Sequence, residues 1–221
     1  MFVLGEGFYR WLSHLWPITI KTAESQMGPV SIRWENGHKV LNSKNGNQSF
    51  GSLHEVWVMT FEAIGLEKLK PGSVLLLGLG GGSVPHILRD QWQIGAPITI
   101  IELDPQMIRI ARDHFGLGDL DNITIIQGDA TIQLHSLKKR FDLIVIDLFS
   151  DLDMARGVET NGFAHALRDR CNEGGTVCFN TVAYDPKSNV RCDQVLSQLK
   201  KVFSQVNEFK FEGVNRVFVA S

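Results

Sequence analysis

The sequence predicts an α/β fold in which a parallel sheet carries helices on both faces. From Ser73 onward, short apolar stretches alternate with helical stretches. The stretch 141–146, FDLIVI, is almost continuously apolar, as expected of a strand that is buried on both faces. A glycine-rich turn, 78–82, directly follows the first of these apolar stretches. Alternation of this kind is typical of a parallel sheet with crossover helices.

The first 50 residues are expected to form a separate unit, made of a helix and a small β-hairpin. Phe8, Trp11, Leu12 and Leu15 fall at helical spacing and should pack on the same chain or on a second subunit, with a membrane surface as the alternative. A strand is expected at 18–22, and a hairpin is expected to join 30–34 to 39–41 across the Asn36-Gly37 pair, followed by a loop over 42–49.

Residues 51–221 are expected to form the α/β domain. Ser52 and Glu55 have the spacing of a capping box, which should open a helix that runs to about Ile64. Strands are then expected at 73–78, 97–103, 123–127, 141–148 and 175–182. Helices are expected between and after them, at 84–93, 105–115, 130–138, 161–170 and 189–204. The chain ends with 206–212 and 216–220, which could pair as an antiparallel hairpin.

The glycine-rich turn, with Gly78, Gly80 and Gly82, is a candidate ligand-binding loop. Glycine allows backbone angles that a Cβ would forbid and lets a ligand approach the main chain. The free N–H groups of the helix that follows favour a polar or anionic group. Such a loop is a weak signal alone, but acidic residues recur at the ends of the next three strands. Because ligands bind at the carboxyl ends of such strands, these acids are candidate site residues.

Each strand-end acid has a candidate role. Glu102 follows the glycine loop by about 20 residues, a spacing that suits a carboxylate that binds both ribose hydroxyls. Asp104 precedes Pro105 and is read as a helix N-cap. Asp129 could bind an adenine amino group while the backbone N–H of Ala130 meets a ring nitrogen; Asp129 could equally cap the next helix.

Asp147, Asp151 and Asp153 lie within seven residues at the end of the fourth strand. Three carboxylates there would form a negative pocket for a cationic group, and like-charge crowding could raise the pKa of one of them and make it a usable base. Asp147 and Asp151 are therefore the candidate catalytic residues. The alternative is a mobile acidic loop.

Composition and charge narrow the class of protein. The chain is 43% hydrophobic and 21% charged, with a net charge of −2 and no block of like charge, so no nucleic-acid partner is expected. Three cysteines without CxxC spacing indicate a reduced, cytoplasmic protein. No apolar run reaches the roughly 20 residues that span a bilayer, and no secretory signal is evident. The histidines at 54, 86 and 114 lack metal-ligand spacing, so no metal is expected.

Four motifs, at 77–83, 101–105, 127–130 and 141–147, resemble those of the spermidine synthase family of aminopropyltransferases, a branch of the class I S-adenosylmethionine-dependent methyltransferase superfamily. The resemblance implies a Rossmann-like class I methyltransferase fold with a small N-terminal β unit. It implies that S-adenosylmethionine or its decarboxylated form is the co-substrate, that a small amine is the acceptor, and that a homodimer is possible. The site residues that it implies are Gly78, Gly80 and Gly82 at the nucleoside's tail, Glu102 at the ribose, Asp129 with Ala130 at the adenine, and Asp147 at the attacking amine.

Three departures from the family pattern concern the amine end. Gly81 stands where the family usually has an aspartate in the glycine loop, and Trp57-Val58 stands in place of a Tyr-Gln pair. The acidic loop 147–153, DLFSDLD, lacks the usual proline. Nucleoside binding is unaffected by these changes, whereas polyamine specificity does not follow.

The leading interpretation is therefore a transferase that moves an aminopropyl or a methyl group to an amine. The acidic loop and the N-terminal hairpin favour the aminopropyl version, and the missing loop aspartate favours the methyl version. A nicotinamide-dependent oxidoreductase is the least favoured class, because Ser83 replaces the third small residue of G-x-G-x-x-G/A. A homologue that binds a nucleoside without catalysis is the remaining alternative.

Overall fold

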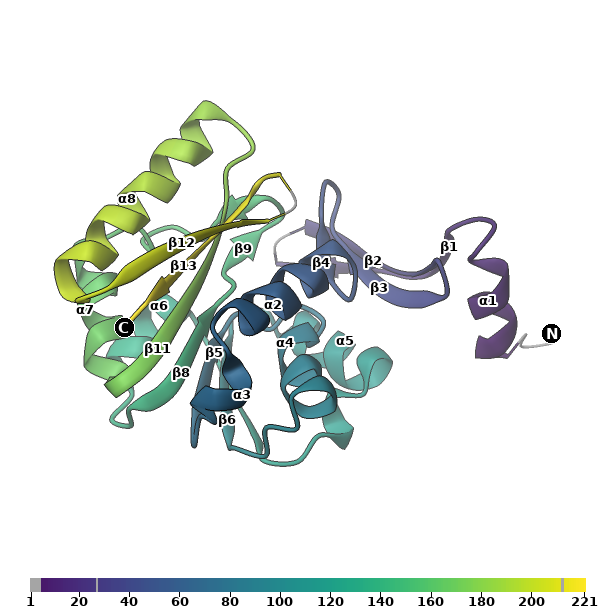
Figure 1. Ribbon diagram of the computed structural model, residues 1–221. Helices are drawn as coiled ribbons and strands as arrows, with labels where there is room; N and C mark the ends of the chain where they lie inside the picture. The colour runs from purple at the N-terminus through teal and green to yellow at the C-terminus, as the bar shows by residue number, and fades with distance from the viewer. Residues whose placement is uncertain (1–4, 27, 212) are drawn as a thin grey trace.

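A seven-stranded, mostly parallel sheet forms the centre of the molecule (Figure 1). The computed structural model describes residues 5–26, 28–211 and 213–221. The strand order is β12-β13-β11-β8-β5-β6-β7. The parallel strands are β5 (Val74–Leu77), β6 (Ile98–Glu102), β7 (Ile123–Gln127), β8 (Phe141–Ile146) and β11 (Cys171–Val182). Antiparallel strands β12 (Val206–Phe211) and β13 (Asn215–Ala220) complete it, as predicted, although Glu212 lies outside the described residues.

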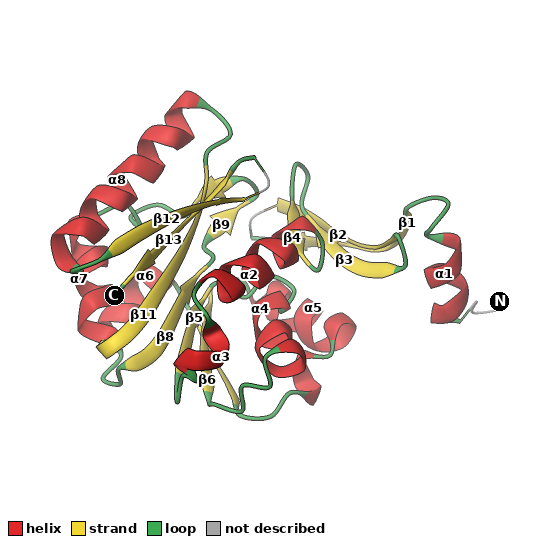
Figure 2. Cartoon of the chain, viewed as in Figure 1, coloured by secondary structure: helices red, strands yellow, loops and turns green. Residues whose placement is uncertain are grey.

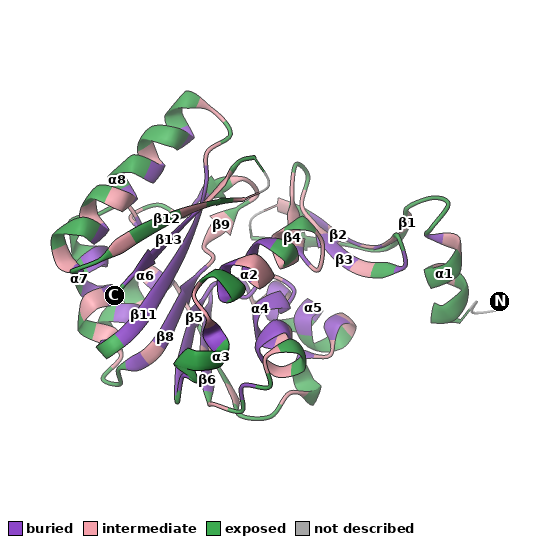
Figure 3. Cartoon of the chain, viewed as in Figure 1, coloured by how far each residue is buried: buried purple, intermediate pink, exposed green. Residues whose placement is uncertain are grey.

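Helices cover both faces of this sheet, which confirms the predicted class of fold (Figure 2). Side chains of β5 alternate between two apolar clusters: Leu75 and Leu77 join one, and Val74 and Leu76 join the other. The first cluster is covered by α6 (Ala130–Ser136), α7 (Asn161–Arg170) and α8 (Pro186–Val202). The second is covered by α2 (Ser52–Ala63), α3 (Leu66–Leu69), α4 (Ser83–His86) with the π-helical turn Ile87–Gln91, and α5 (Pro105–Phe115). The central strands β5, β6 and β8 are buried along most of their length (Figure 3).

A second, antiparallel sheet precedes α2. Its order is β1 (Ile18–Ser25), β2 (Gly28–Glu35), β3 (His38–Asn42) and β4 (Asn47–Ser49). The predicted hairpin is confirmed, with both turn residues at positive φ, 49° at Asn36 and 80° at Gly37. Val30, Ile32 and Leu41 pack on Met107, Ile110 and Phe115 of α5, which fixes this sheet beside the glycine loop.

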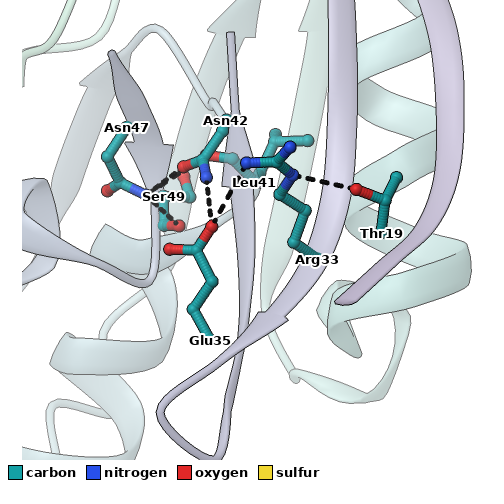
Figure 4. Close-up of polar contacts among 7 residues, drawn as sticks. All are labelled: Thr19, Arg33, Glu35, Leu41, Asn42, Asn47 and Ser49. Atoms are coloured by element: carbon teal, nitrogen blue, oxygen red, sulfur yellow. Dashed lines mark hydrogen bonds and ion pairs between the residues drawn. The ribbon is translucent and has the colours of Figure 1, made fainter. Parts of the chain in front are cut away.

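Strand β4 lies in a segment that was expected to be a loop. The Asn47 side chain donates to Asn42 Oδ1 at 2.8 Å and to Ser49 O at 3.2 Å, which holds the short strand against β3 (Figure 4). Asn47 Oδ1 also accepts from Gly51 N at 3.1 Å and Leu53 N at 3.4 Å, at the start of α2. The expected Ser52 capping box is therefore wrong. The N-cap residue is Gly51, which has no side chain to cap the helix, and the acceptor for the N–H groups at the helix start comes from Asn47 instead.

The last helix also begins before its expected position. α8 starts at Pro186 rather than at 189, because Asp185 and Ser188 form a capping box. Ser188 N donates to Asp185 Oδ1 at 2.6 Å, and Asp185 N donates to Ser188 Oγ at 2.9 Å. A short hairpin of β9 (Phe149–Ser150) and β10 (Asp153–Met154) was not predicted either.

The N-terminal helix α1 (Glu6–Leu12) stands at the far end of the small sheet (Figure 1). None of its residues is buried, and Trp11 is 63% exposed. Leu15 and Trp16, just after the helix, are 73% and 74% exposed. Of the two expected packings, the one on the same chain is therefore not found for the described residues, and the one on a second subunit stays a prediction; residues 1–4 lie outside the described residues.

Candidate active site

A cavity of about 340 Å³ opens at the carboxyl ends of β5, β6, β7 and β8. These are the strands on either side of the point where strand order reverses, since β5 pairs with both β6 and β8. Most of the predicted site residues line it together: Gly78, Gly80, Glu102, Asp129, Ala130 and Asp147. Gly82 and Asp151 do not. Sequence reasoning missed other lining residues, among them Gln26, Gln48, Phe149 and Arg156.

Gly78 lets the loops after β5 and β8 approach each other. Its φ is +88°, and its N–H donates to Ile101 O at 2.9 Å. A Cβ at this position would lie 2.1 Å from the backbone oxygen of Asp147, so no other residue fits without moving that loop.

The rest of the glycine loop is held by the N-terminal sheet. Gly81 N donates to Ser49 Oγ at 2.6 Å, and a Cβ on Gly81 would lie 2.9 Å from Ser49 Cβ. Ser83 Oγ accepts from Phe50 N at 2.7 Å. Gly82 is buried and faces Leu117 rather than the cavity. The residue that replaces the family's loop aspartate is therefore covered by β4.

Glu102 is held by two backbone amides. It is 5% exposed; Oε2 accepts from Leu79 N and Oε1 from Asp104 N, each at 2.8 Å. Burial raises the pKa of this carboxyl, and the two amide hydrogen bonds oppose the rise only in part. Glu102 lines the cavity, and a carboxylate can accept more hydrogen bonds than these. Asp104 caps α5 as predicted, since its Oδ1 accepts from Gln106 N at 2.8 Å.

Asp129 caps α6 and lines the cavity at the same time. Its Oδ1 accepts from Thr131 N at 2.8 Å and from Thr131 Oγ1 at 2.7 Å. Within the described part of the chain, Oδ2 has no hydrogen-bond partner, so it is available to a ligand. Ala130 follows in the first turn of α6 and lines the cavity beside it. The two roles that the sequence left open are compatible here.

Asp147 is bound by two neutral donors from distant elements. Trp57 Nε1 of α2 donates to Oδ2 at 3.1 Å, and Asn180 Nδ2 of β11 donates to Oδ1 at 3.0 Å. Burial raises the pKa of Asp147, with the two hydrogen bonds acting in the opposite direction. The sequence singled out Trp57 as a departure from the family pattern but gave no signal for Asn180.

The expected cluster of three carboxylates is not found. Asp151 faces the N-terminal unit, where Ser43 Oγ and Asn45 Nδ2 donate to it at 2.5 Å and Asn45 N at 3.0 Å. It lines an adjacent cavity of about 270 Å³. Burial tends to raise the pKa of Asp151, but these hydrogen bonds lower it overall. Asp153 accepts from the Tyr184 hydroxyl at 2.8 Å. Asp151 and Asp153 are separated from Asp147 because the β9–β10 turn directs them to other partners.

Within residues 5–26, 28–211 and 213–221, no group of three or more His, Cys, Asp or Glu side chains could hold a metal ion. No helix in the same ranges is long and apolar enough to cross a membrane.

Comparison with known proteins finds similarity to methyltransferases and to an aminopropyltransferase. Residues 74–175 match the family model of a methyltransferase domain. A polyamine aminopropyltransferase of Vibrio vulnificus is 28% identical over 156 residues, which cover 68% of this chain and 50% of that protein. An eEF1A lysine and N-terminal methyltransferase of Danio rerio is 33% identical over 105 residues, 44% of this chain and 15% of that protein. The chain thus spans half or less of the length of these two relatives.

Solved structures agree on the fold. A probable spermidine synthase from Corynebacterium glutamicum has a TM-score of 0.72 at 17% identity, with 91% of this chain and 79% of that chain covered. Human methyltransferase-like protein 13 in complex with SAH has a TM-score of 0.66 at 24% identity, with 78% and 82% covered. Residues 74–175 thus match a methyltransferase domain, and the fold of the chain is that of class I methyltransferases. A polyamine aminopropyltransferase is similar to the chain in sequence, and solved spermidine synthases share its fold.

Proposed function

We propose that the chain is a transferase that binds an S-adenosylmethionine-type co-substrate and moves its alkyl group to an amine. The observation that carries this proposal is the convergence of four strand ends on one cavity, with Gly78, Glu102, Asp129 and Asp147 in its wall. Asp129 and Ala130 suit the adenine, Glu102 suits the ribose hydroxyls, and the glycine loop leaves room for the sulfonium end. Asp147 then lies on the reacting side.

The transfer reaction needs two contributions from the protein: positioning of the amine against the sulfonium, and one proton transfer. The lone pair of a neutral amine attacks the carbon next to the sulfonium, the C–S bond breaks, and its electron pair goes to sulfur. The acceptor amine becomes neutral by losing a proton before this attack, and Asp147 is the acceptor for that proton in the cavity wall. A carboxylate with a raised pKa is a better base than an ordinary one, and a fixed geometry lowers the entropic part of the barrier.

We favour methyl transfer over aminopropyl transfer. Decarboxylated S-adenosylmethionine ends in an ammonium group, which needs a carboxylate near the glycine loop. Gly81 supplies none and is covered by Ser49, and Asp151 is bound to Ser43 and Asn45. Among the described residues that line the cavity, Asp147 is therefore the carboxylate that remains on the reacting side, where it serves as the base. Relatives that are named as lysine and N-terminal methyltransferases support the same choice.

Aminopropyl transfer is the second candidate. A polyamine aminopropyltransferase matches 68% of the chain, and the small N-terminal sheet lies beside the glycine loop. An oxidoreductase is less consistent with the site, because Asp129 and Asp147 have no required place in hydride transfer. A catalytically inactive homologue is less consistent as well, because Asp147 keeps two donors and a place in the cavity wall.

The proposal is tested by calorimetric titration of the purified protein with four compounds in parallel: S-adenosylmethionine, decarboxylated S-adenosylmethionine, methylthioadenosine and NAD. We expect S-adenosylmethionine to bind more tightly than its decarboxylated form. The reverse preference would establish the aminopropyl candidate and direct the search to diamines. Binding of NAD alone, or of none of the four, would contradict the proposal.

Replacing Asp129 with alanine should weaken binding of the adenosyl group by about tenfold, because a hydrogen bond to a charged acceptor is lost. Asp151→Ala is the matched comparison, since Asp151 lies outside this cavity, and it should change the affinity by less than about twofold. Calorimetry with methylthioadenosine measures both variants without a contribution from the amine. Equal losses in the two variants would contradict the site assignment.

A further inference from the structure

A chain of side-chain hydrogen bonds runs behind Asp147 across three neighbouring strands. Asn215 of β13 donates from Nδ2 to Asn180 Oδ1 at 3.0 Å. Asn180 of β11 then donates from Nδ2 to Asp147 Oδ1, also at 3.0 Å. Asn180 is 1% exposed, so its amide cannot exchange these partners for bulk water. The two asparagines are not needed to build the sheet, which is paired through the backbone.

The direction of this chain is set by its members. With Asn215 donating to its oxygen, Asn180 must present its NH2 group to Asp147. A flipped Asn180 would place its oxygen against a carboxylate and its NH2 group against that of Asn215. Trp57 can only donate, and it meets the other oxygen of Asp147. The carboxylate is therefore held at both oxygens, by donors from opposite sides.

We propose that Asn180, oriented by Asn215, is a positioning residue that holds the Asp147 carboxylate with its remaining lone pairs directed at the acceptor amine. This inference rests on the proposed function of the cavity. Asn180 also lines the adjacent cavity, next to the one that Asp147 lines, so it belongs to the wall between the two. A donor on each oxygen restricts rotation of the carboxyl group, as partners of catalytic and metal-ligating groups do elsewhere.

The positioning has an electrostatic consequence. Hydrogen bonds to the charged form favour that form, so the bond from Asn180 lowers the pKa of Asp147 against the rise caused by burial. The ionisable groups around it are Glu102, Asp129 and Arg156 in the same cavity wall and Asp151 beside the next cavity. No hydrogen bond joins any of these four to Asp147 in the described ranges. Loss of Asn180 should therefore raise the pKa of Asp147 further.

The test is a titration of Asp147 followed by ¹³C NMR on protein labelled at the aspartate carboxyl carbons, with its signal assigned by its loss in Asp147→Asn. We expect Asn180→Ala to move the titration upward by about one pH unit, and to move the acidic limb of the kcat/KM profile by the same amount. Asn215→Ala should also raise the pH at which Asp147 titrates, by a smaller amount. This variant replaces Asn180→Ala in the test if Asn180→Ala does not fold.

A matched control lies on the same strand. Asn172, at the start of β11, donates to Asp142 Oδ1 of β8 at 2.7 Å, at the opposite end of the sheet from the cavity. Asn172→Ala should leave both the Asp147 titration and the kcat/KM profile unchanged. A titration of Asp147 that does not move in Asn180→Ala and Asn215→Ala would overturn the proposal, even if turnover falls. The NMR titration needs no turnover, so it tests the positioning role even in a protein without activity. Absence of activity in the unmodified protein would contradict only the proposed function.

Discussion

Asp147→Asn should reduce turnover by about 10²- to 10⁴-fold, while the affinity for the co-substrate changes by less than about threefold. Asparagine has nearly the same shape but cannot accept the proton that the acceptor amine must lose before it attacks. In the proposed site the nucleoside contacts Glu102 and the residues at the start of α6 instead, so its binding should persist. Single-turnover kinetics measure the first effect, and calorimetry measures the second.

The proposed role of Asp147 as a base also predicts how the activity of the unmodified protein depends on pH. Asp147 must be ionised to act as a base, and its pKa is raised by burial. Activity should therefore fall as the pH is lowered through a value above the ordinary pKa of an aspartate. For folding, a raised pKa in the folded state means that the contribution of this group is most favourable at low pH and is lost as the pH rises through that pKa.

Asp142→Asn is the control for this substitution. Asp142 lies at the other end of β8, where it accepts from Asn172 and from Ser73 Oγ. Its replacement is expected to lower the melting temperature without changing turnover of the folded protein. A large loss of co-substrate affinity in Asp147→Asn would make Asp147 a binding residue. Unchanged turnover would remove it from the mechanism.

Glu102→Gln should weaken co-substrate binding by about 100-fold. The ribose hydroxyls would lose a charged acceptor, and hydrogen bonds to charged groups contribute about 1.5 to 3 kcal/mol each. The amide NH2 of glutamine would also face the backbone N–H of either Leu79 or Asp104, which leaves one buried donor without an acceptor. We therefore expect the melting temperature to fall as well.

Calorimetry with methylthioadenosine and with free adenine separates these two effects. Adenine lacks the ribose, so its affinity should change little in Glu102→Gln, whereas that of methylthioadenosine should fall. Glu67→Gln, on the exposed short helix α3, is the control for the same chemical change away from the cavity. Equal losses for the two ligands would show that Glu102 supports the loop rather than binding the ribose.

Local signals in the sequence were sufficient to predict the central sheet and the strand-end acids that line its cavity. Buried strands that end in a glycine turn or an acid are recognised from neighbouring residues, and so is the Asp104 cap of α5. The partners of Asp147 are different, because Trp57 lies 90 positions away in the sequence and Asn180 33 positions away. No periodicity in the sequence connects such residues.

The failed predictions have the same physical origin. Ser52 and Glu55 have the spacing of a capping box, but Asn47 reaches the first turn of α2 from β4 and provides the acceptor instead. Asp151 was predicted to join Asp147 because the two are close in sequence. Its actual donors, Ser43 and Asn45, are more than 100 positions away, and the positive φ of Asp151, 59°, turns the chain toward them.

Two hydrogen bonds join the end of the small sheet to the glycine loop and to the first residue of α4, and they make the small sheet an energetic part of the proposed binding site. Ser49 is bound to Gly81, Phe50 to Ser83, and Gln48 lines the cavity itself. Thermodynamic coupling of this kind is reciprocal. If the co-substrate favours the arrangement of the glycine loop that binds β4, it must favour the docked position of β4 by the same factor. A partner that displaces the small sheet must then weaken co-substrate binding by that factor. Affinity for the nucleoside could therefore be controlled from a surface that the nucleoside never touches.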